Sequence, residues 1–289
     1  MFRTLLFIPG NNRRFIEKAK FLNADIICFD LEDSVPLNEK QIARKLVSEA
    51  LDNKAEYGNR NVYVRINSYE SDMAIQDLDA IVSNGMDGIV VPKVNDEREV
   101  NHLSLELTEL ERQKVINKKI RIMASIESAQ GLVNSYSIAR ADSRVNILVF
   151  GVFDFLYDMR LDYVQDGIEY SFARAKIPID ARAAGIGAID AIWQKVDDIE
   201  GLVRDAAIAK RLGYCGKCII HPKQLEPVTK VFIPSNNEIH WAKKVVAALG
   251  ETMEKGRGKG AVTVDGRMVD AVHYRQARSI LDSLNSGDM

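Results

Sequence analysis

The sequence predicts an α/β fold, a (β/α)8 TIM barrel followed by a C-terminal helical extension. Short apolar runs alternate with helix-like segments, eight such alternations fill residues 4 to 220, and the pattern changes after Pro234. Repeated strand–helix units give parallel strands joined by crossover helices. A barrel of eight such units typically takes ~250 residues. We therefore expect a barrel domain over residues 1–233 and an extension over 234–289 of this 289-residue chain.

Each expected strand is a short apolar run bounded by turn or charged residues. The expected strands are Thr4–Ile8, Asp25–Phe29, Asn61–Ile66, Gly88–Val91, Ile120–Ile126, Val145–Phe150, Gly187–Ala191 and Gly216–Ile220. Helical patterns between them include Asn38–Leu51, Glu97–Val115, Gln130–Ala141, Gly167–Ala184 and Gly201–Leu212. A doubly wound open sheet is the alternative, but its glycine-rich fingerprint is missing, because Gly185-x-Gly187 is too short and precedes a strand.

The extension begins with one long helical pattern and ends with a second helix. In order, we expect a helix over Asn236–Met253, a basic glycine stretch over 256–260, a strand over Ala261–Val264, a turn at Asp265-Gly266 and a helix over Ala271–Leu284. The glycine stretch is equally consistent with a solvated linker and with the hinge of a lid over the barrel mouth, since loops of this composition occur in both roles.

The composition is that of an ordinary soluble globular protein, with 46% hydrophobic and 28% charged residues and a net charge of −2. This balance gives no reason to expect a nucleic acid or a membrane surface as a partner. The run Leu5–Ile8 is too short for a signal-peptide core. Three cysteines do not make a disulfide framework, so we expect a cytoplasmic protein.

Cys215 and Cys218 form a C-x-x-C pattern, for which a redox or metal role is one interpretation. There is no second cysteine pair and no helix start follows directly, so we expect Cys218 to be a small core residue.

Two acids stand where a metal enzyme would need them. Glu127 follows the run Ile120–Ile126, and Asp154 follows the run Val145–Phe150 after a short turn. A carboxylate at the mouth of a buried strand is costly unless something cationic meets it. The pair is therefore a candidate divalent-cation site, and active sites of barrels lie at these strand ends.

Charged or imidazole side chains follow most of the other expected strands, which core packing does not require. These strand ends carry Asp30, Glu32 and Asp33, then Arg65, Lys93, Asp190 and His221. For Asp30 and Lys93, a structural role in a buried salt bridge is as good an interpretation as a role in a functional site. For His221 a structural place at a strand end is favoured over a general base.

Magnesium fits this set of acids best, because it takes oxygen ligands from one or two carboxylates and keeps positions for water and substrate. Glu127 and Asp154 would be the protein ligands. Arg65 offers a planar fork for a substrate carboxylate. The implied chemistry is that of a carboxylated carbonyl compound handled as an enolate, with the metal as Lewis acid.

An ordered set of sequence blocks resembles the citrate lyase beta subunit family, which includes citryl-, malyl- and citramalyl-thioester lyases of the HpcH/HpaI aldolase superfamily. The blocks are Leu6–Asn11, Phe29–Val35, Val64–Asn67, Val91–Lys93, Ile126–Gly131, Gly151–Asp154, Gly216–Pro222 and Gly266–Asp270.

The resemblance implies a homotrimeric barrel with Glu127 and Asp154 as Mg²⁺ ligands, and Arg65 holding a substrate carboxylate. It implies that Glu32 and Asp33 act through metal-bound water. Asp270 matches the catalytic acid/base, which the extension delivers to a neighbouring subunit. Lys93 and Glu127 are expected to contact substrate beside Arg65.

The implied reaction is cleavage of a 3-hydroxy-3-carboxyacyl thioester, on CoA or on an acyl carrier protein, to an acetyl thioester and a 2-oxo acid. Oxaloacetate, pyruvate and glyoxylate all remain open, because Phe153 and the stretch 154–160 depart from the family pattern. The alternatives are a malyl- or citramalyl-CoA lyase, a thioesterase of the same family, and a non-catalytic subunit that assembles with acyl-carrier and transferase partners.

Overall fold

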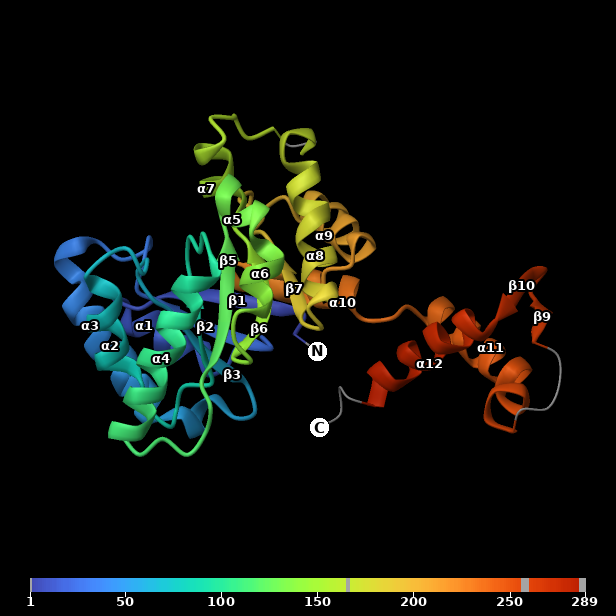
Figure 1. Cartoon of the computed structure of the whole chain (residues 1–289), viewed down its shortest axis with the longest axis horizontal. Helices are drawn as coiled ribbons and strands as arrows, with labels where there is room; N and C mark the ends of the chain where they lie inside the picture. Colours follow the sequence, from blue (N-terminus) through green and yellow to red (C-terminus); the bar gives the residue numbers. More distant parts are fainter. Residues whose placement is uncertain (1, 165–166, 256–259, 286–289) are drawn as a thin grey trace. The chain divides into compact units, whose positions relative to one another are not determined.

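Eight short apolar runs pair in parallel and close into a barrel (Figure 1). The structure, a computed structural model, describes residues 2–164, 167–255 and 260–285. The chain divides into two units, the barrel from Phe2 to Phe232 and a smaller unit from Ile233 onward. The glycine stretch for which a linker or a hinge was expected lies outside the described residues, apart from Gly260.

The barrel strands confirm the predicted fold class. They are β1 (Thr4–Pro9), β2 (Ile26–Asp30), β3 (Asn61–Arg65), β4 (Gly88–Val91), β5 (Arg121–Ile126), β6 (Val145–Phe150), β7 (Gly187–Asp190) and β8 (Gly216–Ile219). Every strand end lies within one residue of the expected position. Leu5 of β1 pairs with Ile26 of β2 and with Cys218 of β8, which closes the sheet and excludes the open doubly wound alternative.

The connecting helices agree less closely with the expectations. They are α1 (Arg13–Ala19), α2 (Lys40–Asp52), α3 (Met73–Ile81), α4 (Glu97–Gln113), α5 (Ala129–Val133), α6 (Ser135–Arg140), α7 (Val152–Asp158), α8 (Ser171–Ala183), α9 (Ile199–Leu212) and α10 (Leu225–Phe232). The single helix expected over Gln130–Ala141 is wrong. Asn134 divides it into α5 and α6, and its side chain donates to the Asn95 carbonyl at 2.8 Å. No helix in the described ranges is long and apolar enough to cross a membrane.

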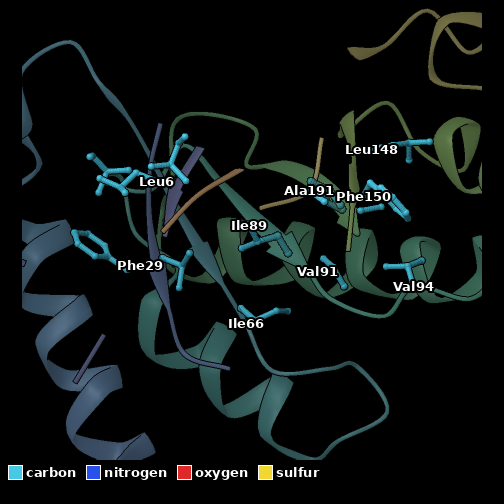
Figure 2. Close-up of a cluster of buried hydrophobic side chains, with 14 of the residues drawn as sticks. Leu6, Phe29, Ile66, Ile89, Val91, Val94, Leu148, Phe150 and Ala191 are labelled. Carbon is cyan, nitrogen blue, oxygen red and sulfur yellow. The ribbon is translucent and has the colours of Figure 1, made fainter. Parts of the chain in front are cut away.

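Strand alternation sorts the apolar side chains into two layers. One residue set from the strands packs inside the barrel, including Leu5, Ile26, Tyr63, Met123 and Cys218. The alternate set, with residues such as Leu6, Phe29, Ile89, Leu148 and Phe150, packs against the helices (Figure 2). Cys218 is thus a buried core residue, as expected, with a free thiol.

Asp190 belongs to the outer layer, so its expected place at the barrel mouth is wrong. It follows the inward-facing Ile189, and alternation turns it toward α8 and α9. There Asp190 contacts Lys217 at 2.5 Å and Arg174 at 2.7 Å, and Asp205 contacts the same two cations at 2.6 and 2.8 Å. Two acids and two bases neutralise one another, which makes this cluster a structural tie between barrel and helices.

The smaller unit has a hairpin between two helices. It contains α11 (Asn236–Lys255), β9 (Ala261–Val264), β10 (Arg267–Asp270) and α12 (Ala271–Asn285). Asp265 and Gly266 both adopt positive φ, as a two-residue hairpin turn requires. The sequence predicted both helices, β9 and the turn, but not β10, whose apolar run has only two residues. Val245, Leu249, Val264, Val269 and Ala277 form part of its own core.

Breaking the balanced cluster from one side should destabilise the barrel. Lys217→Met leaves Asp190 and Asp205 buried with one cation in place of two, and breaking a buried pair in this way costs about 3–5 kcal/mol. Urea unfolding should show this loss. Lys230→Met, which removes an exposed pair with Glu226, is the matched control and should cost under about 0.5 kcal/mol. Equal stability losses in the two variants would contradict the structural role.

Candidate functional site

A buried ion pair joins the carboxyl ends of β2 and β3. Asp30 and Arg65 are register partners, and Arg65 donates Nε and Nη2 to the two Asp30 carboxylate oxygens, both at 2.7 Å. The guanidinium also stacks on the inward-facing Phe7 ring, 4.8 Å from its centroid. Burial opposes ionisation of Asp30, but the Arg65 charge and its hydrogen bonds hold the pKa of Asp30 below its ordinary value. The predicted salt bridge of Asp30 is therefore present, and its partner is Arg65.

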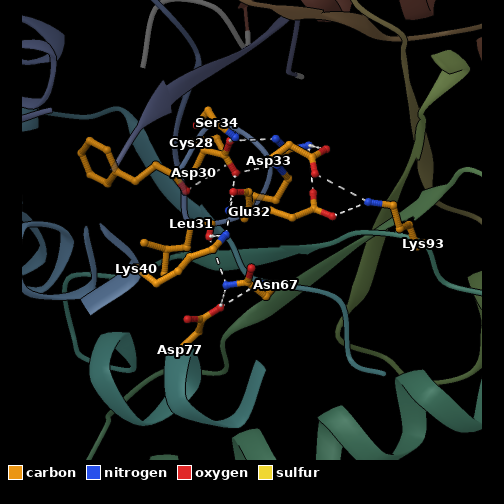
Figure 3. Close-up of polar contacts among 12 residues, drawn as sticks. Cys28, Asp30, Leu31, Glu32, Asp33, Ser34, Lys40, Asn67, Asp77 and Lys93 are labelled. Carbon is orange, nitrogen blue, oxygen red and sulfur yellow. Dashed lines mark hydrogen bonds and ion pairs between the residues drawn. The ribbon is translucent and has the colours of Figure 1, made fainter. Parts of the chain in front are cut away.

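Hydrogen bonds to Asp30, Lys40 and Asn67 fix the loop after β2 (Figure 3). Asp30 Oδ1 accepts from the Glu32 backbone N–H at 2.9 Å. Lys40, on α2, is buried and donates its ammonium to the carbonyls of Leu31 and Glu32 at 2.6 and 2.7 Å. Asn67 donates to the Leu31 carbonyl at 3.0 Å. These contacts fix the backbone of Leu31 and Glu32. The helical sequence pattern around Lys40 did not reveal that its ammonium binds this loop.

Lys93 connects the acids across the mouth. Its ammonium lies 2.6 Å from Glu32 Oε1, 3.8 Å from Asp33 Oδ1 and 3.5 Å from Asp154 Oδ1. Lys93 has a φ of 54°, a left-handed conformation that costs energy for a residue with a Cβ. The alternative interpretation of Lys93 as half of a salt bridge is thus correct for its contact with Glu32, and the lysine also faces the two more exposed acids.

Glu32 is only partly satisfied by these cations. Its Oε2 is buried and lies 3.1 Å from Arg65 Nη1, yet it has no hydrogen-bond partner within the described part of the chain. Burial raises the pKa of Glu32, although Arg65 and Lys93 oppose the rise. An under-satisfied carboxylate oxygen of this kind suits a cation or a substrate hydroxyl.

Glu127 lies at the end of β5 and is buried among the other acids. Burial, followed by the charges of Glu32 and Asp154, raises its pKa to about 8. Gly151, which begins the turn after β6, makes room for it. A Cβ at that glycine would lie 2.4 Å from Glu127 Cγ, closer than such atoms approach. The glycine before α7 is therefore a requirement of the Glu127 side-chain position.

Asp154 occupies the first turn of α7, and its side chain is 41% exposed. With it, the mouth brings together Asp30, Glu32, Asp33, Glu127 and Asp154 around two cations, Arg65 and Lys93. The described residues hold no ready-made cluster of three or more acid, histidine or cysteine ligands. A hard divalent cation would draw one or two carboxylates from Glu127, Asp154 and Glu32, and oxygens of water or substrate for the rest.

Asp270 lies at the end of β10, in the smaller unit, and its role toward the barrel residues stays a prediction. Its Oδ1 accepts from the Val272 backbone N–H at 2.9 Å and lies 2.8 Å from His273 Nδ1. His273 was not predicted from the sequence, although the spacing Asp-x-x-His at a helix start is visible in it. His221 Nδ1 accepts from the Lys223 backbone N–H at 3.1 Å, which agrees with a structural place.

Comparison with known proteins finds consistent relatives. A family model for the HpcH/HpaI aldolase/citrate lyase family matches residues 3–222. Citrate lyase subunit beta of Leuconostoc mesenteroides subsp. cremoris is 37% identical, over 99% of this chain and 94% of the relative. The (3S)-malyl-CoA thioesterase of Cereibacter sphaeroides is 34% identical, over 97% of this chain and 93% of the relative.

Solved structures agree with these relatives. CitE of Mycobacterium tuberculosis, in complex with magnesium, acetoacetate and coenzyme A, is 26% identical with a TM-score of 0.79, and the match covers 97% of both chains. The citrate lyase beta subunit of the same organism, complexed with oxaloacetate and magnesium, is 26% identical with a TM-score of 0.69, over 81% of this chain and 97% of that one.

Filling the space at Gly151 should disturb the acid cluster. Gly151→Ala places a methyl group against the Glu127 side chain, which must move. We expect divalent-cation affinity, measured by calorimetric titration, to fall about 10–100-fold, as for other changes that reorient a ligand. Gly250→Ala is the matched control, because a Cβ there meets nothing within 4 Å. Wild-type affinity in Gly151→Ala would remove Glu127 from the cation site.

The raised pKa of Glu127 should make metal-free stability fall with rising pH. Between its ordinary value of 4.5 and about 8, Glu127 stays protonated in the folded state but ionises on unfolding. The unfolded state therefore binds fewer protons, and stability is lost at about 1.4 kcal/mol per pKa unit, a few kcal/mol in total.

Glu127→Gln cannot ionise and should lose this pH dependence. Urea unfolding in EDTA at pH 5 and pH 8 measures the difference, and added divalent cation should restore stability to the wild type at pH 8 more than to the variant. Parallel pH profiles for the two proteins would show that Glu127 has an ordinary pKa.

Proposed function

The chain belongs to the HpcH/HpaI aldolase/citrate lyase family, and from this premise we propose that it is a Mg²⁺-dependent carbon–carbon lyase. The substrate is a 3-hydroxy-3-carboxyacyl thioester of the citryl type, and the products are an acetyl thioester and a 2-oxo acid. One observation carries the proposal. The buried Glu127 lies with Asp154 and Glu32 in an excess of carboxylates, on a barrel whose relatives bind magnesium with oxo acids.

The residues present fit a magnesium ion. Glu127 and Asp154 supply hard oxygen donors. Glu32 Oε2, which lies near Arg65 but accepts no hydrogen bond from the described residues, belongs to the same group of acids. When bound, the ion supplies Lewis-acid polarisation of the carboxylate and carbonyl oxygens of the oxo acid. It also supplies the cationic charge that Glu127 needs in order to ionise at neutral pH.

Arg65 and Lys93 orient the substrate. Asp30 takes the Nε and Nη2 edge of Arg65. Nη1, which lies 3.1 Å from Glu32 Oε2, is the group that would turn to a substrate carboxylate. Lys93 balances the acids and offers a second cationic contact at the mouth. Phe153, beside Asp154, packs on Tyr163 with ring centroids 5.2 Å apart, and we propose that this aromatic pair borders the oxo-acid end of the site.

Cleavage needs one base and one acid. Glu32 or Asp33 accepts the proton of the 3-hydroxyl group, the C–O bond becomes a carbonyl, and the C2–C3 bond breaks. Its electron pair stays on the departing acetyl thioester as an enolate. Asp270 then gives a proton to the methylene carbon, which becomes the methyl group. In the synthetic direction Asp270 removes that proton. We place Asp270 in a neighbouring subunit of a homotrimer, with CoA or an acyl carrier protein holding the thioester.

A thioesterase is the second candidate, because the malyl-CoA thioesterase relative matches almost the whole chain. It would use the same cation but direct water onto the thioester carbonyl. A non-catalytic subunit, assembled with acyl-carrier and transferase partners, is less well supported. Such a role needs none of Glu127, Asp154, Arg65 and Asp270, and all four are present.

Mass-spectrometric turnover of citryl-, citramalyl- and malyl-CoA by the purified protein tests the proposal. Release of acetyl-CoA and one oxo acid, abolished by EDTA, is the expected result and names the substrate. Free CoA with an intact hydroxy acid would support the thioesterase instead. No turnover of any thioester, including one on an acyl carrier protein, would overturn both enzymatic proposals.

Replacing Asp270 should stop the chemistry but not binding. Asp270→Asn removes the group that exchanges the methyl proton, and kcat should fall about 10²–10⁴-fold, as for loss of a positioned acid or base. Because Asp270 is not assigned to the cation, calorimetric affinities for Mg²⁺ and oxo acid should stay within about twofold. Loss of Mg²⁺ binding in this variant would contradict the role given to Asp270.

A further inference from the structure

His273 lies against Asp270 at the start of α12. One ring nitrogen, Nδ1, lies 2.8 Å from the Asp270 carboxylate Oδ1 and 3.2 Å from the Asp270 backbone nitrogen. The carboxylate also accepts from the Val272 backbone N–H, again through Oδ1. The contacts to the carboxylate use Oδ1, and within the described part of the chain Oδ2 accepts no hydrogen bond, so it is the oxygen available to a substrate.

The two contacts of Nδ1 exclude each other. An unprotonated Nδ1 can accept from the Asp270 N–H, whereas a protonated Nδ1 can donate to the Asp270 carboxylate. The first arrangement is a capping box, in which the third helical residue accepts from the backbone of the N-cap residue. The second arrangement holds a proton 2.8 Å from the group that must exchange one.

To act as an acid, Asp270 needs a neighbouring group that supplies it with a proton. The hydrogen bond from His273 and the backbone N–H of Val272 lower the pKa of Asp270, so its carboxyl group is ionised at neutral pH. An ionised carboxylate has no proton to give to an enolate. Imidazole is the side chain that holds and releases protons near neutral pH, and the His273 side chain is 36% exposed, within reach of water.

We propose that His273 relays protons between Asp270 and solvent, an inference that rests on the proposed role of Asp270 in the lyase reaction. In cleavage a neutral His273 ring with its proton on Nδ1 gives that proton to the Asp270 carboxylate, while Nε2 takes a proton from solvent. The Asp270 carboxyl group, now protonated, gives its proton to the methylene carbon and is a carboxylate again. In synthesis the same proton moves outward. No electrons are transferred to or from the pair in either direction.

His273→Gln separates the relay from the cap. Glutamine is the usual capping-box partner and keeps an acceptor for the Asp270 N–H, but its amide cannot take up or release a proton near neutral pH. We expect kcat for thioester cleavage to fall about 10²-fold, with an unchanged melting temperature and with partial recovery in added imidazole. His240→Gln, which changes an exposed histidine on α11, should keep the wild-type kcat. A wild-type kcat in His273→Gln would show that His273 only caps the helix.

A second measurement does not depend on turnover. The ¹⁵N shifts of the His273 ring report which nitrogen carries a proton, and the relay requires a protonated Nδ1 in the wild type. A ring protonated only on Nε2 overturns the relay, whatever the activity. A wild-type protein that turns over no thioester contradicts the proposed lyase, and the ring measurement then still decides whether the proton lies between His273 and Asp270.

Discussion

The mouth of the barrel depends on the ion pair between Asp30 and Arg65. Parallel pairing of β2 with β3 places the two residues side by side, and both point inward at the carboxyl ends of their strands. The pair then positions the neighbouring loop. Asp30 binds the Glu32 backbone, and Arg65, held on the Phe7 ring, turns its remaining donors toward Glu32. A buried charge tolerates little movement, because removing its partner costs several kcal/mol. The loop that carries Glu32 and Asp33 is therefore built on an interaction that also stabilises the barrel.

The acids that surround this pair are not balanced by the protein. Lys93 reaches three of them and adopts a strained backbone conformation in doing so. Glu127 stays largely protonated near neutral pH, since burial and neighbouring acids disfavour its charge. Such a group becomes a good ligand when a cation offsets those charges, and ionisation then accompanies binding. Burial therefore destabilises an ionised Glu127 in the metal-free site, and a bound cation would offset this cost.

Periodicity was enough to predict the barrel, because each strand is a separate apolar run and eight of them leave few other topologies. It also located Glu32, Arg65, Lys93, Glu127 and Asp154 at one end of the barrel. The resemblance, and not the periodicity, singled out Asp270.

The prediction for Asp190 was wrong, because it used only the position of the residue at a strand end. It did not consider whether the side chain points into the barrel or toward the helices. Lys40 was not found, since a lysine in a helical pattern carries no sign that its ammonium will turn back to bind two carbonyls. Asn134, which divides a predicted helix, acts through a contact with a distant loop, which local sequence does not reveal.

Two ionic clusters in one barrel show how charge balance separates structure from function. Asp190 and Asp205 lie on the outer side of the sheet with Lys217 and Arg174, and every charge there has a partner of the opposite sign. Such a cluster has no need of a ligand and offers it no exposed group. The cluster at the mouth faces inward and combines a stable pair with an excess of acids, one of which has an oxygen without a hydrogen-bond partner among the described residues. The two clusters also differ in exposure, because the outer cluster is almost wholly buried, whereas Asp33, Lys93 and Asp154 at the mouth are partly exposed. Because successive side chains of a strand point to opposite faces of the sheet, position in the strand decides which cluster a residue joins. Asp30 points inward and belongs to the mouth, whereas Asp190 points outward and belongs to the structural cluster.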